Sequence, residues 1–194
     1  MADGSGSGAD LHPLQSPWTL WYYQAPANGS HSGGSGEWEQ NLTAVGSFET
    51  VEGFWGYYRN AIWPSCIDFK SNYHLFKKGI QPMWEDPANE KGGKWVWAIL
   101  SQLDKYWDNL VLGLIGEAID PTGDEVCGAV ISRRRAADRI SVWNRTSDNK
   151  DLIMNLGKAI KKAVIDEVEH PPKFSMEWTV HMENNKTKPI RYTM

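Results

Sequence analysis

Several short segments of this chain are aromatic-rich or have apolar residues that alternate with polar ones or follow one another almost without interruption, and these patterns predict strands. These segments cover residues 18–23, 94–100, 115–119, 126–132, 139–144 and 174–182. Three other segments repeat their apolar residues at helical spacing: one after Thr50, one over residues 101–114 and one after Asp148. The helices come singly between groups of strands, and 126–132 lies close enough to 139–144 for a hairpin. We therefore expect an α+β fold with a mainly antiparallel sheet.

The segment 139–144 shows what each face of the sheet carries. Ile140 and Val142 point to one face, so Arg139, Ser141 and Trp143 share the other. One face is therefore predicted to be core, and the other to be polar and aromatic.

Two segments are rich in Gly and Ser and have little to bury. Residues 1–10 are predicted to be a disordered tail, and residues 25–36 a flexible loop. The remainder, residues 11–194, is the size of one domain.

Composition and charge limit the classes of function. No apolar run approaches the roughly 20 residues that span a bilayer, and the N-terminus has no secretory pattern, so we expect a cytoplasmic protein, with a nuclear pool as an alternative, and no membrane partner. Cys66 and Cys127 form no metal-binding pattern, and reduced thiols fit best. The net charge of -4 argues against a broad basic face for nucleic acid. A local basic pocket stays open at Arg133, Arg134 and Arg135, although such a run is more often a solvated strand end.

Eleven tryptophans are the richest source of candidate chemistry. Trp38 and Trp84 stand in acid-flanked polar settings and are predicted to face a ligand. Trp55 lies on the apolar stripe of a helix, which indicates either packing or docking. The tryptophans assigned to packing are Trp18, Trp21, Trp63, Trp95, Trp97, Trp107 and Trp178.

Glu85 directly follows Trp84, and its carboxylate could accept two parallel N–H bonds such as guanine presents on one edge. Glu85 and Asp86 could instead be a catalytic pair. No histidine or nucleophile lies near this pair in the sequence at a spacing typical of a catalytic site. We therefore expect neither an enzyme nor a metal or other cofactor.

Several motifs in one order, from about residue 12 to the C-terminus, resemble the eukaryotic translation initiation factor 4E family, which binds the mRNA cap. They are His12-Pro13-Leu14-Gln15, Thr50-Val51-Glu52-x-Phe54-Trp55, Tyr73-x-Leu75-Phe76-Lys77-x-Gly79-Ile80, Pro82-Met83-Trp84-Glu85-Asp86, Gly92-Gly93-Lys94-Trp95, Leu114-Ile115-Gly116-Glu117 and Asp124-x-Val126-Cys127-Gly128-Ala129-Val130. The resemblance implies one domain with a curved, mainly antiparallel sheet of about eight strands and about three helices on its convex face.

The resemblance also implies a role for each candidate residue of the cap site. Trp38 and Trp84 would sandwich the 7-methylguanine base, and Glu85 would accept hydrogen bonds from its edge. Trp143 would lie beside the methyl group. The residues that would hold the cap phosphates are Arg134, Arg139 and Lys94.

On the back of the sheet the resemblance implies a partner site for the four-G class of initiation scaffold and for competing binding proteins, which present a short helix. Its residues would be His12, Pro13, Leu14, Val51, Trp55 and Leu112. Asp108 and Asn109 replace what is commonly an apolar-acidic pair in the family, so partner specificity is expected to differ. The protein alone is expected to be a monomer.

The function predicted from the sequence is therefore cap binding with recruitment of the initiation scaffold. One alternative keeps the fold but makes the protein a cap-binding translational repressor. A carbohydrate-binding module and a nucleotide hydrolase are further alternatives. A carbohydrate-binding module would not explain the arginines beside Trp143, and a nucleotide hydrolase would need a group of metal ligands or a catalytic base that the sequence does not show.

Overall fold

The computed structural model describes residues 11–26, 35–165, 168, 175–181 and 191–194. The predicted tail, residues 1–10, and residues 27–34 of the predicted loop lie outside the described residues. A curved, fully antiparallel sheet with the order β2-β1-β3-β5-β6-β4-β7-β8 forms the centre of the protein. The strands are β1 (Pro13–Tyr23), β2 (Leu42–Thr50), β3 (Asn72–Lys77), β4 (Gly93–Ile99), β5 (Val126–Ser132), β6 (Asp138–Asn144), β7 (Glu177–Val180) and β8 (Arg191–Thr193).

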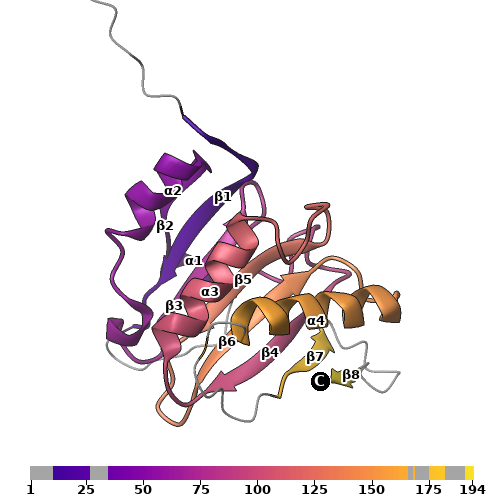
Figure 1. Ribbon diagram of the computed structural model, residues 1–194. Coiled ribbons are helices and arrows are strands. Elements are labelled where there is room, and N and C mark those ends of the chain that lie inside the picture. Colours follow the sequence, from indigo (N-terminus) through magenta and orange to yellow (C-terminus); the bar gives the residue numbers. More distant parts are fainter. Residues whose placement is uncertain (1–10, 27–34, 166–167, 169–174, 182–190) are drawn as a thin grey trace, which may run out of the picture.

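Three helices cover one face of this sheet (Figure 1). They are α2 (Val51–Tyr58), α3 (Leu103–Ile115) and α4 (Lys150–Ile165), and a single 3-10 turn, η1, covers Pro64–Cys66. A short helix, α1 (Ser35–Gln40), precedes β2. None of the helices in the described ranges has the length and apolar composition needed to cross a membrane. The α+β architecture predicted from the sequence is confirmed.

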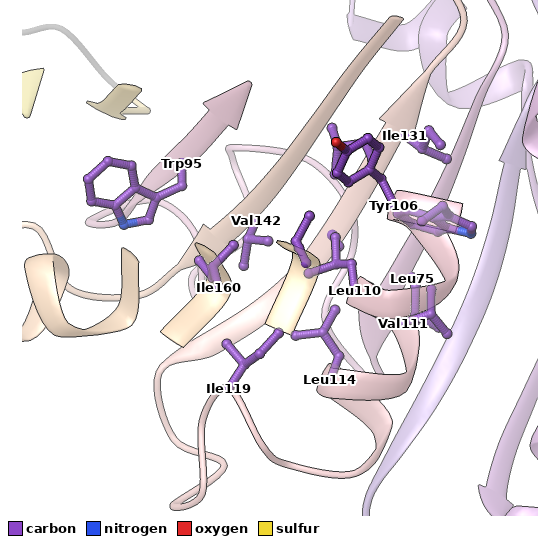
Figure 2. Close-up of a cluster of buried hydrophobic side chains, with 14 of the residues drawn as sticks. Leu75, Trp95, Tyr106, Leu110, Val111, Leu114, Ile119, Ile131, Val142 and Ile160 are labelled. Carbon is purple, nitrogen blue, oxygen red and sulfur yellow. The ribbon is translucent and has the colours of Figure 1, made fainter. Parts of the chain in front are cut away.

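The main core lies between the helices and the sheet. Leu110, Val111 and Leu114 of α3 are at most 2% exposed. Figure 2 shows these side chains among the residues of the sheet and of α4, which include Leu75, Trp95, Ile131, Val142 and Ile160. Two buried indole N–H groups of this core are paired: Trp95 Nε1 donates to the carbonyl of Ile153 (3.1 Å), and Trp178 Nε1 donates to Asn144 Oδ1 (2.9 Å).

A second, smaller cluster lies on the opposite face, which we call the open face because α2, α3 and α4 do not cover it. The cluster comprises Phe76, Ile80, Cys127, Val130 and Trp143. Along β6 the prediction of alternate faces is confirmed: Ile140 and Val142 belong to the helix-side core, whereas Trp143 lies in the second cluster.

Most elements predicted from periodicity are present. Thr50 caps α2, its side chain accepting from the backbone N–H of Gly53 (3.1 Å), and α3 and α4 follow where the apolar spacing placed them. The strand segments 18–23, 94–100, 126–132 and 139–144 match β1, β4, β5 and β6, and β7 lies inside the segment 174–182.

Two predictions about apolar residues were wrong. Residues 115–119 are not a strand, because Ile115 still belongs to α3 and Glu117 takes a left-handed conformation (φ 53°) that turns the chain. Trp63, assigned to packing, is 54% exposed, because it lies in the connection before η1 while its neighbour Pro64 turns inward.

Candidate functional site

A row of aromatic rings crosses the open face from β1 to the end of β7. Consecutive ring centroids lie 5.8, 5.8, 6.4, 5.5 and 4.1 Å apart along the series Tyr23, Trp38, His74, Phe76, Trp143 and His181. The series draws on four strands or strand ends and on α1, so it forms only when the sheet is assembled. A flat aromatic or cationic ligand would find stacking partners along this row.

Trp38 is held by two of these rings. Its ring stacks on Tyr23 with an angle of 16° between the planes and meets His74 edge-on at 82°. The side chain stays partly exposed. Because α1 carries Trp38 and two rings support it, its orientation is fixed by packing.

Trp84 and Glu85 are presented by the loop between β3 and β4. Trp84 is 46% exposed, and Glu85 is also exposed. The Asp86 carboxylate accepts a hydrogen bond from the backbone N–H of Gln81 (2.9 Å). The buried Asn89 side chain donates a hydrogen bond to the backbone carbonyl of Gln81 (2.9 Å). These bonds give the loop a defined shape around an exposed indole.

The loop is anchored on the cluster that contains Trp143. Ala88 packs against this cluster, and the Cys127 thiol donates to the Ala88 carbonyl (3.4 Å). Phe76 of the same cluster contacts His74, which supports Trp38. The fold therefore brings Trp38, the Trp84 loop and Trp143 to the same face of the sheet.

Three cations gather at this face. Burial first, and then the positive charge of Arg139, lower the pKa of both Arg134 and Lys94. The Lys94 ammonium also lies 5.6 Å from the Trp143 ring centroid. Cations that disfavour one another in partly buried positions would be stabilised by an anion, and a phosphate group suits them.

His74 and His181 belong to the site and were missed from the sequence. Burial first, and then a neighbouring positive charge from Arg134 or Lys94 respectively, lower the pKa of each imidazole to about 3. Both rings are therefore neutral at pH 7 and serve as flat supports. Strand β3 was also missed: polar and apolar residues alternate only from Asn72 to Leu75, and its polar residues are buried together with the apolar ones.

On the helix-covered face, the N-terminal residues of the predicted partner site are fastened to α2. The carbonyl of His12 accepts from the N–H of Val51 (2.8 Å), and the Glu52 carboxylate binds both the backbone N–H (3.0 Å) and Nδ1 (2.7 Å) of His12. These bonds lower the pKa of Glu52 to about 2. Pro13 pairs with Thr50 in the sheet, and the Leu14 side chain packs partly against the core.

Trp55 of α2 and Leu112 of α3 are two of the apolar residues that this face offers. Trp55 is half-buried against Phe54 (4.8 Å between ring centroids), and Leu112 is 45% exposed. The Tyr58 hydroxyl donates to Asp108 and so joins the two helices. Because Leu112 lies one turn beyond Asp108 on α3, it is on the side of α3 that faces α2. Exposed apolar residues on two adjoining helices can receive a third helix.

Comparison with known proteins agrees with this geometry. The family model described as eukaryotic initiation factor 4E matches residues 13–193. The chain is 39% identical over 184 residues to eukaryotic translation initiation factor 4E-2 of Schizosaccharomyces pombe, covering 93% of this chain and 71% of the relative. It is 34% identical over 177 residues to eukaryotic translation initiation factor 4E of Homo sapiens, covering 89% and 76%.

Solved structures of similar proteins contain ligands and partners. Ascaris suum eIF4E-3 in complex with an m7G cap is 36% identical, with a TM-score of 0.79 over 94% of this chain and 98% of that one. C. elegans eIF4E-3 in complex with the 4E-binding protein Mextli and a cap analog is 36% identical, with a TM-score of 0.78 over 89% and 94%. The family match over nearly the whole described chain and these identities show that this protein belongs to the eukaryotic translation initiation factor 4E family.

Proposed function

We propose that this protein binds the 7-methylguanosine cap of mRNA on its open face. The observation that carries the proposal is the supported row of rings with cations at its edge, in a chain whose relatives are solved with caps bound. Rings suit the methylated base, and cations suit the phosphates that follow it.

In this proposal Trp38 and Trp84 stack on the two sides of the methylated base. Methylation gives the guanine ring a positive charge, and indole faces attract cations, so stacking would discriminate against unmethylated guanine. Glu85 accepts two N–H bonds from the guanine edge and so selects guanine over adenine. Trp143, whose ring is supported by Phe76 and His181, lies beside the methyl group.

Arg134, Arg139 and Lys94 take the cap phosphates. The positive charge of Arg139 disfavours protonation of the other two. A bound polyphosphate reverses this effect, so these groups gain more from the ligand than isolated surface cations would. Binding requires no bond to be made or broken and no cofactor. The family is one of translation initiation factors and not of enzymes, which confirms the expectation of a non-enzymatic protein.

We further propose that the back of the protein recruits an initiation scaffold through a short amphipathic helix. Trp55 and Leu112 would pack against its apolar face, and His12, Pro13, Leu14 and Val51 would extend the contact. Solved structures of C. elegans and schistosome relatives contain binding proteins, which supports a partner site in this chain. A role in initiation would place the protein, as a monomer, in the cytoplasm. Pull-down of an initiation scaffold supports the initiating role, whereas exclusive pull-down of a repressor protein contradicts it.

Retention on a cap-analogue resin tests the cap-binding proposal. Trp84→Ala should nearly abolish retention, because it removes one of the two stacking surfaces. Trp63→Ala is the matched control, since Trp63 is similarly exposed, at 54% against 46%, but belongs to the connection before η1. Equal retention of both variants would show that Trp84 does not contact the base.

A further inference from the structure

The arginine run at the end of β5 is only partly accounted for by the cap phosphates. Arg133 pairs with Asp138 (2.6 Å), and its guanidinium lies 5.0 Å from the ring centroid of Phe69. Arg134 belongs to the cluster of cations on the open face. Arg135 is exposed.

Arg135 lines a hollow of about 480 Å³ beside the open face. Phe69, Lys70, Asp68, Gln24 and Asn41 contribute to the same wall. Pockets of roughly 300–1,000 Å³ suit small ligands, and this volume is enough for one nucleotide. We call this region the Phe69 hollow.

The Phe69 hollow adjoins the proposed cap site along two backbone connections. Gln24 directly follows Tyr23, the residue on which Trp38 stacks, and the N–H of Gln24 donates to the carbonyl of Asn41 (3.1 Å). The N–H of Asn41 in turn donates to the carbonyl of Trp38 (3.1 Å). On the other side, Arg135 directly follows Arg134. The hollow therefore begins next to the residue proposed to hold the cap phosphates, so an RNA chain that leaves Arg134 has a short path to it.

The chemistry of the hollow is that of a platform for single-stranded nucleic acid. Phe69 is 51% exposed, and Arg133 lies over its ring. Lys70 and Arg135 outnumber Asp68 among the charged lining residues, two against one, while Asp138 neutralises Arg133. An exposed ring with cations beside it binds a base by stacking and its phosphate by charge, without sequence preference.

We propose that the Phe69 hollow binds the RNA chain beyond the first transcribed nucleotide, with a base on Phe69 and a phosphate between Lys70 and Arg135. This inference rests on the proposed cap-binding function, which it extends from the cap to the RNA body. It also explains how a protein of net charge -4 can hold RNA, since the positive charge is confined to one edge of the site.

The test compares two ligands, a cap dinucleotide and a capped, unstructured ten-nucleotide RNA, by competition fluorescence anisotropy. The length gain is the ratio of their affinities. We expect a gain of about fivefold or more in the natural protein, because this is the increase in affinity that stacking of a single base contributes. Phe69→Ala and the double variant Lys70→Ala/Arg135→Ala should each reduce the gain to below about twofold and leave dinucleotide binding unchanged. The double variant should also lower the salt slope of RNA binding by about 1.

Two further variants control for a general loss of positive charge and for a loss of structure. Lys158→Ala/Lys162→Ala removes two exposed positive charges from α4 on the opposite face and should leave the gain unchanged. Asp68→Asn removes the opposing charge of the hollow and should increase the gain, which no loss of structure would do.

The outcomes separate the two proposals. Failure of the natural protein to bind the dinucleotide contradicts the cap-binding function itself. Normal dinucleotide binding with a gain that is absent, or that is the same in all variants, overturns the Phe69 hollow as an RNA site. A phosphoserine-rich peptide that binds the natural protein but not Lys70→Ala/Arg135→Ala, together with an unchanged RNA gain, would assign the hollow to an acidic protein and also overturn the inference.

Discussion

The imidazole of His74 should make the stability of this protein fall at mildly acidic pH. His74 is 4% exposed, and Trp38 and Phe76 contact its ring. In the described part of the chain neither of its ring nitrogens has a hydrogen-bond partner. Burial, and then the positive charge of Arg134, lower its pKa from 6.5 to about 3. The folded protein therefore keeps this ring neutral at pH values where an unfolded chain protonates it.

The sign and size of the effect follow from the two pKa values. Between pH 6.5 and pH 3 the unfolded state binds more protons than the folded state, so the free energy of unfolding decreases as the pH falls. At pH 5.0, which is about 1.5 pH units below the unfolded pKa, one such group costs about 2 kcal/mol. This loss is a large fraction of the roughly 5–15 kcal/mol by which domains are stable.

Urea unfolding at pH 7.5 and pH 5.0 measures this cost when the natural protein is compared with His74→Gln, whose amide does not titrate. The natural protein should lose about 2 kcal/mol more than the variant over this interval. His181 titrates in the same direction in both proteins, so its contribution cancels. Equal losses in the two proteins would mean that His74 is not held neutral and would refute the reasoning.

Three further changes have expected outcomes. Trp178→Phe removes the hydrogen bond to Asn144 Oδ1 and leaves a buried acceptor unpaired, so the free energy of unfolding should fall by about 1–3 kcal/mol; a change below about 0.5 kcal/mol would contradict the pairing. Thr50→Ala removes the N-cap bond to Gly53 and should cost about 1 kcal/mol in urea unfolding, and Thr50→Ser should restore most of it. Leu112→Arg should prevent pull-down of a scaffold peptide and leave cap-resin retention unchanged, whereas loss of both would indicate a folding defect.

The elements that the sequence predicts well are those with a local period. Helix α2 combines a capping Thr50 with apolar residues at helical spacing, and β6 alternates between core residues and residues of the open face. Strand β3 keeps such a period for only four residues, Asn72 to Leu75, and its polar residues are buried as well as its apolar ones. The segment 115–119 is apolar enough for a strand, yet its backbone turns at Glu117, which periodicity alone does not reveal.

For the candidate site, the sequence predicts which residues are exposed better than which residues support them. Exposed Trp84 and Glu85 stand in a polar motif that can be recognised locally. The support of Trp38 by Tyr23 and His74 depends on contacts between residues far apart in the chain, so no spacing rule predicts it. The Phe69 hollow likewise appears only when the ends of β1, β3 and β5 meet.

Titration of intrinsic tryptophan fluorescence with 7-methyl-GTP and with GTP tests the central claim most directly, because the proposed binding surface consists of indole rings. We predict saturable quenching by 7-methyl-GTP and at least about tenfold weaker binding of GTP, since two indole faces stabilise a cationic base and lose that attraction when the ring is neutral. Equal affinities for the two nucleotides, or no quenching by either, would contradict cap recognition on the open face.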